Sequence, residues 1–176
     1  MLKRRAVLLT AGSALLPRVA LGQADQRPSV TVAVQNISTS GTLEPMREQS
    51  NVGFRVMPSF AECMIEMDWT RTQRPRPGLA TEWSAVEGDG KRWIFKLRQG
   101  VKFHDGTDFD ADVVVWNLEK ILNDKSPQFD PKQAAQARGR VPTLVGWKAV
   151  DKYTVELTTR VVNALFPYDM SYVFYS

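Results

Sequence analysis

The segment RWIFKLR, at residues 92–98, constrains the fold more than any other part of the chain. Trp93, Phe95 and Leu97 occupy every second position in it, and successive side chains of a strand lie on opposite faces of a sheet. The turn sequence EGDG, at residues 87–90, precedes this segment, and residues 82–86 form a shorter extended stretch before the turn. The pattern predicts a β-hairpin with one buried face.

A further hairpin is predicted near the end of the chain, where GWKAVDKYTVELTT spans residues 146–159. Its two strands are expected to join across Asp151 and Lys152, and its apolar positions are Val150, Tyr153, Val155 and Leu157. A first strand is predicted at residues 29–35, where valines alternate with other side chains. The small polar loop at residues 36–42 then follows a strand end, where α/β sheets tend to bind ligands, although a solvated turn has the same composition.

Two helices are predicted. Ser50 is placed to cap the first, which runs through residues 51–67, and Pro58 is expected to kink or restart it. One face of this helix would carry Val56, Met57, Phe60 and Met64. The second helix follows Asp110, and the chain between this helix and the last hairpin is expected to be a loop.

Two shorter segments complete the expected organisation. Residues 71–78, RTQRPRPG, are interpreted as a proline-rich linker with solvated arginines. Gly100 is expected to turn the chain before a short strand at residues 101–103. Cys63 lies in an apolar context and is interpreted as a small buried side chain, and a chain with one cysteine forms no internal disulfide.

The only histidine, His104, stands among four carboxylates, Asp105, Asp108, Asp110 and Asp112. Such a group could form a metal site, an acid–base centre, or ordinary turn and cap chemistry. Position favours the last: Asp105 precedes Gly106 in a strong turn pair, Asp110 fits a helix N-cap, and Asp112 lies in the first helical turn. We therefore expect no catalytic residue, no metal ligand and no cofactor.

The first 24 residues combine a basic head, a short apolar run and a small-residue stretch, the pattern of a secretory signal peptide. Arg4 and Arg5 suggest twin-arginine export, and the Sec route stays open. No cysteine lies at the expected cleavage site, so no lipid anchor is expected there. The chain has 23 basic and 19 acidic residues, and four of the basic ones belong to residues 1–24, so residues 25–176 are balanced and give no support to nucleic-acid binding.

Residues 77–122 resemble the signature segment of the family 5 extracellular solute-binding proteins, the peptide- and nickel-type receptors of ABC importers. The likeness is carried by PGLATEW at 77–83, DGK at 89–91, GVKFHDG at 100–106 and the pair Ala111-Asp112. Thr42-Leu43-Glu44-Pro45 also resembles the Leu-Asp-Pro turn of the family. Val113 departs from the pattern, because many members have an aspartate there that completes a capping box.

The resemblance implies an α/β protein in which residues 25–176 form the N-terminal part of lobe I of a two-lobed, type II periplasmic-binding-protein fold, with a mixed sheet and a hairpin-rich subdomain. It implies a periplasmic, monomeric receptor that binds a peptide or a related small solute and partners an ABC permease. Family members place the loop after the first strand at the cleft, so the expected ligand contacts are Ser38, Thr39, Ser40 and Gly41.

Two alternatives stay open: a small exported hydrolase or metalloenzyme using His104 and Asp105, and an interaction domain. The second alternative rests on the aromatic, apolar segment at residues 161–175, which is expected to pack on later parts of a longer protein. Residues 25–176 alone are accordingly expected to be marginally soluble and to bind solute weakly.

Overall fold

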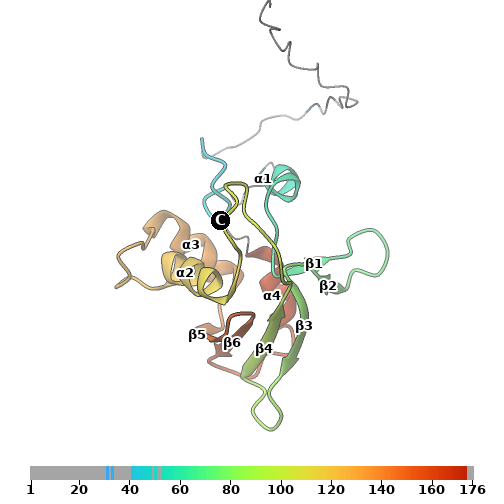
Figure 1. Ribbon diagram of the computed structural model, residues 1–176, viewed down its shortest axis with the longest axis vertical. Coiled ribbons are helices and arrows are strands. Elements are labelled where there is room, and N and C mark those ends of the chain that lie inside the picture. Colours follow the sequence, from blue (N-terminus) through green and yellow to red (C-terminus); the bar gives the residue numbers. More distant parts are fainter. Residues whose placement is uncertain (1–30, 32, 34–40, 49, 51–52, 174–176) are drawn as a thin grey trace, which may run out of the picture. The chain divides into compact units, whose positions relative to one another are not determined.

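A four-stranded antiparallel sheet organises the chain in the computed structural model, which describes residues 31, 33, 41–48, 50 and 53–173. The chain divides into two units, Met1–Ala33 and Val34–Ser176, and the sheet belongs to the second. The sheet has the order β3-β4-β6-β5, built from β3 (Ala80–Ala85), β4 (Arg92–Leu97), β5 (Leu144–Asp151) and β6 (Thr154–Thr159). Helix α2 (Ala111–Leu122) lies against β5 and β6, and helix α3 (Pro131–Arg140) lies beside α2 (Figure 1).

The two predicted hairpins are confirmed. Strand β3 pairs with β4 across a turn in which Gly88 and Gly90 adopt positive φ angles of 75° and 64°, a conformation that glycine accepts without steric cost. Strand β5 pairs with β6 across a two-residue connection, Lys152 and Tyr153, one residue later than the predicted Asp151 and Lys152. The predicted α/β class is confirmed, although the pairings among the described strands are antiparallel and the strand expected at residues 29–35 lies outside the described part.

One face of the sheet is buried, as the alternation predicts. Trp93 and Phe95 of β4 lie opposite Leu157 and Val155 of β6, and directly opposed residues of an antiparallel pair share a face. Helix α2 contributes Val114, Leu118 and Ile121 to the same core. The helix begins at the predicted N-cap, where the Asp110 carboxylate accepts from the N–H groups of Asp112 and Val113 at 3.1 and 3.2 Å.

The segment at residues 161–175, which was expected to pack on later parts of a longer protein, partly belongs to the core of this unit, which corrects that expectation. Phe166 opens helix α4 (Phe166–Asp169), and Met170 opens the 3-10 turn η2 (Met170–Tyr172). Phe166, Met170 and Val173 are fully buried, and the Phe166 ring lies 6.1 Å from the rings of Trp93 and Phe95. Val161, Val162 and Leu165 remain exposed, and the last three residues lie outside the described part.

The long helix predicted after Ser50 is mostly wrong. The Ser50 hydroxyl does accept a hydrogen bond from the N–H of Gly53 at 3.1 Å, as a cap would. However, helix α1 (Gly53–Val56) is only four residues long and passes into a 3-10 turn, η1 (Met57–Ser59), where the helical segment ends. The chain then becomes strand β1 (Ile65–Met67), which pairs with β2 (Pro75–Pro77). The segment interpreted as a proline-rich linker therefore forms half of a hairpin, and tertiary pairing has overridden the helical spacing.

Smaller differences have local causes. Val150 is 54% exposed rather than apolar core, because an irregular register between Ala149 and Asp151 turns it outward. Residues 101–103 form one isolated bridge, Lys102 with Asp108, instead of a strand. The expected loop before β5 contains α3. Cys63 is buried as predicted, and burial raises the pKa of its thiol well above the ordinary value.

Candidate functional site

The turn at residues 42–48 stands immediately after the loop predicted to contact ligand. The Thr42 hydroxyl accepts from the N–H of Glu44 at 3.0 Å. The Glu44 carboxylate in turn accepts from the N–H groups of Met46 and Arg47 at 2.9 and 3.2 Å. These side-chain bonds satisfy backbone donors at the start of a helical turn, so Thr42-Leu43-Glu44-Pro45 encodes its own conformation.

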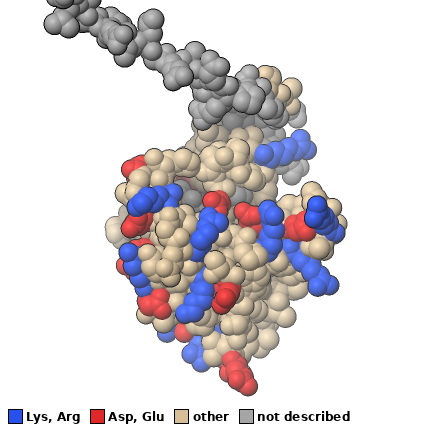
Figure 2. Space-filling model, turned by 45° about the vertical axis from the view of Figure 1, so that its right-hand side comes forward, with Lys and Arg blue, Asp and Glu red and all other residues tan. Residues whose placement is uncertain are grey.

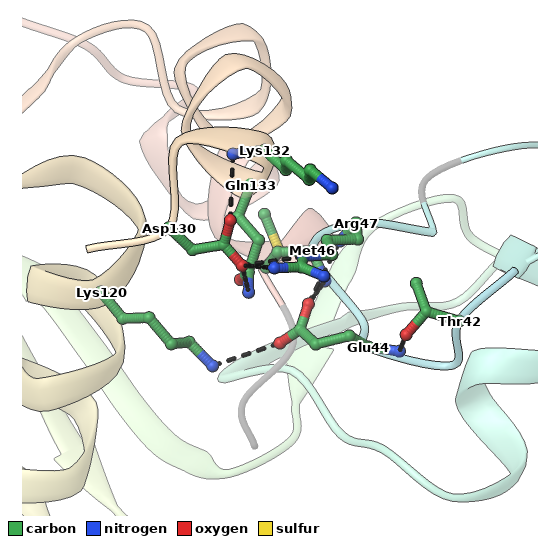
Figure 3. Close-up of polar contacts among 8 residues, drawn as sticks. All are labelled: Thr42, Glu44, Met46, Arg47, Lys120, Asp130, Lys132 and Gln133. Atoms are coloured by element: carbon green, nitrogen blue, oxygen red, sulfur yellow. Dashed lines mark hydrogen bonds and ion pairs between the residues drawn. The ribbon is translucent and has the colours of Figure 1, made fainter. Parts of the chain in front are cut away.

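Two ion pairs fix this turn to the helices. The other oxygen of Glu44 lies 3.2 Å from Lys120 of α2, and Arg47 reaches Asp130, the N-cap of α3, at 2.6 Å (Figure 3). Both Lys120 and Asp130 are largely buried, with 12% and 14% of their side chains exposed. Desolvation raises the pKa of Asp130, but hydrogen bonds from Gln133 and Arg47 outweigh it and lower that pKa overall. The turn therefore has a rigid support.

A hollow of about 360 Å³ lies against this turn. Three segments and the single residue Leu79 line it; the segments are the turn itself, the chain after η1, and the chain between Val101 and Phe109. Its lining is mostly apolar and includes two carboxylates, a lysine and a histidine. The lining residues are Leu43, Glu44, Pro45, Phe60, Ala61, Glu62, Leu79, Val101, Lys102, Phe103, His104 and Phe109. Apolar surface with a few polar groups is the composition of small-molecule sites.

In the sequence, the predicted ligand residues closely precede the part of the turn that lines this hollow. Ser38, Thr39 and Ser40 lie outside the described residues. Gly41 is described: it is exposed, has a φ of 71°, and is separated by one residue, Thr42, from the lining residues Leu43, Glu44 and Pro45. The sequence did not indicate Phe60 or Phe103 as lining residues, and no local pattern distinguishes them from core aromatics.

The carboxylates around His104 have structural partners. Asp105 accepts from the N–H and hydroxyl of Thr107 at 2.9 and 2.7 Å, and the Thr107 hydroxyl is the main cause of its lowered pKa. Asp108 pairs with Lys102, and Asp110 caps α2. Within the described residues, no three His, Cys, Asp or Glu side chains are grouped as metal ligands. Asp112 lies in the first turn of α2, as predicted, so each of the four acids has a structural role.

The surface of this unit mixes charges of both signs, as Figure 2 shows for one face. No helix among the described residues has both the length and the apolar character needed to span a bilayer. The absence of a single-sign field on this face agrees with the balanced charge of residues 25–176.

Comparison with known proteins decides the family. The model of the bacterial extracellular solute-binding proteins, family 5 (middle), matches residues 74–176, more than half of the chain and all of the four-stranded sheet with α2 and α3. The chain belongs to this family. Family 5 members are transport-binding proteins and not enzymes, and the predicted resemblance is confirmed.

Curated relatives agree with the family. The probable deoxycholate-binding periplasmic protein YgiS of Escherichia coli K12 is 28% identical over 141 residues, covering 74% of this chain and 26% of YgiS. The glutathione-binding protein GsiB of the same strain is 29% identical over 154 residues, covering 88% of this chain and 27% of GsiB. The family 5 chain thus spans about a quarter of the length of these relatives.

A solved structure agrees in fold. The dipeptide binding protein of Pseudoalteromonas sp. SM9913, in complex with Met-Leu, superposes with a TM-score of 0.65 over 76% of this family 5 chain and 28% of that protein. The two sequences are 19% identical there, so this likeness concerns the fold alone. The type II periplasmic-binding-protein architecture expected from the sequence is confirmed.

Proposed function

We propose that this protein is the periplasmic receptor of an ABC importer and that it binds a peptide or a related small solute without chemical change. The family match over residues 74–176 carries the proposal. Receptors of this architecture close two lobes on the solute by hinge motion and present it to a membrane permease. Residues 25–176 would supply the N-terminal part of the first lobe. Residues 1–24 would be a signal peptide that directs export. The exported protein would be a monomer without a lipid anchor at the cleavage site.

For the solute contacts we propose Ser38, Thr39, Ser40 and Gly41, together with the hollow that begins at Leu43. Small hydroxyl side chains and accessible backbone amides suit a carboxylate or a peptide backbone, and the mostly apolar hollow suits a side chain. The ion pairs from Glu44 and Arg47 to α2 and α3 support this assignment, because they hold the turn beside the loop in one position.

A solute screen tests this function. The exported form of the whole gene product should be melted alone and with dipeptides, tripeptides, glutathione, deoxycholate and a nickel chelate. We expect one class to raise the melting temperature with a saturating concentration dependence, since a ligand that binds only the folded state stabilises it. Flat melting curves across the whole set, for a protein that unfolds cooperatively, would contradict the proposal.

A further inference from the structure

The loop between β1 and β2, at residues 68–74, has a conformation fixed by one side chain. The Asp68 carboxylate accepts from the N–H and hydroxyl of Thr70, the N–H of Arg71, and the N–H and hydroxyl of Thr72, at 3.0–3.3 Å. Gln73 adopts a φ of 51°, which is uncommon for a residue with a side chain. The only acid of this loop is thus directed inward onto the loop's own backbone.

The same loop presents an indole and basic side chains to solvent. Trp69 is 61% exposed, and Arg71 and Arg74 are exposed with no carboxylate at ion-pair distance in the described part of the chain. On the strands, Arg76 reaches Glu66 at 2.6 Å, yet 60% of its side chain stays accessible. The hairpin extends beside the four-stranded sheet in Figure 1, so these groups are displayed on a projection.

We propose that this hairpin contacts the anionic headgroups of a phospholipid surface. Guanidinium groups bind phosphate oxygens through paired hydrogen bonds, and an exposed indole favours the boundary between headgroups and acyl chains. The lipid surface as occupant rests on the proposed function, since a receptor that delivers solute to a permease works beside a membrane. None of the residues that line the solute hollow belongs to the hairpin, so the two sites can be tested separately.

Vesicle sedimentation tests this inference with the exported whole protein. Wild type should bind phosphatidylglycerol vesicles more strongly than phosphatidylcholine vesicles, and high salt should weaken that binding. Each arginine near such a surface contributes about fivefold to the partition coefficient, so Arg71→Gln with Arg74→Gln should lower it by roughly twentyfold. Trp69→Ala should lower it further.

Matched variants show whether vesicle binding depends on the hairpin itself or only on the net charge and the number of exposed indoles of the protein. Lys132→Gln with Arg138→Gln changes the charge equally on exposed positions of α3, and Trp116→Ala removes another exposed indole. Both should bind vesicles like wild type. Equal losses in control and hairpin variants, or no preference for phosphatidylglycerol, would overturn the proposal.

Two further readouts identify the cause of a failure. Hairpin variants should keep the solute-induced rise in melting temperature, so loss of vesicle binding alone leaves the proposed receptor function intact. Hairpin variants that bind vesicles normally but lose transport with a reconstituted permease would place an acidic protein surface at the hairpin and overturn the lipid assignment.

Discussion

Replacing Phe166 with alanine is expected to lower the free energy of unfolding by about 3–5 kcal/mol. The ring is fully buried and lies 6.1 Å from both Trp93 and Phe95, in the edge or tilted geometries that aromatic pairs favour. Truncation would remove these contacts and leave a cavity against β4. Urea denaturation of the purified protein measures the change.

The adjacent Leu165 provides the control. It is 64% exposed, so Leu165→Ala should change the free energy of unfolding by no more than about 0.5 kcal/mol. Similar effects of the two substitutions would show that Phe166 is not core and that the segment is held by packing elsewhere, as the sequence alone suggested.

Removing the Glu44 carboxylate should have the second-largest effect. Glu44→Ala leaves the N–H groups of Met46 and Arg47 without their side-chain acceptor and deprives the largely buried Lys120 of a carboxylate. Hydrogen bonds that involve a charged group contribute about 1.5–3 kcal/mol each, and partial exposure of this pair reduces its share, so we expect a loss of about 2 kcal/mol. Solute affinity should fall as well, because the turn beside the ligand loop loses its support.

Glu62→Ala is the matched control, since Glu62 also lines the hollow. Its ion pair with Arg98 is exposed, with 46% of the Glu62 side chain and 41% of the Arg98 side chain accessible. Exposed ion pairs of this kind typically contribute about 0–1 kcal/mol to the free energy of unfolding. Chemical denaturation and a solute titration on both variants provide the comparison. Equal losses in stability would contradict the anchoring role assigned to Glu44.

Much of the fold could be predicted because the informative signals were local. Alternation at Trp93, Phe95 and Leu97 predicts a half-buried strand, and Asp110 before an apolar periodic run predicts a helix start. Helix α3 was missed because its buried positions are Gln133, Ala134 and Ala137, which give almost no apolar pattern. Its Asp130 cap before Pro131 was the available signal.

The errors arose where distant partners decide the outcome. Apolar residues do recur at helical spacing from Val56 to Met64, yet residues 65–67 pair with residues 75–77 in a two-stranded sheet, in which both strands are edge strands. Prolines are tolerated on such edges, so RPRP did not exclude a strand. In the site, the turn at Glu44 was indicated by family resemblance, but Lys120 and Asp130 lie 76 and 83 residues beyond their partners, a separation that no local pattern can reveal.

The most direct measurement of the receptor function is calorimetric titration of the exported whole protein with the solute class found in the melting screen, followed by recovery of the solute. We predict a single saturating heat signal, one solute per protein, and unchanged solute, and we expect the solute recovered from His104→Ala to be unchanged as well. Continuous heat release, with converted solute and loss of that conversion in His104→Ala, would contradict the account and favour an exported enzyme that uses His104 and Asp105.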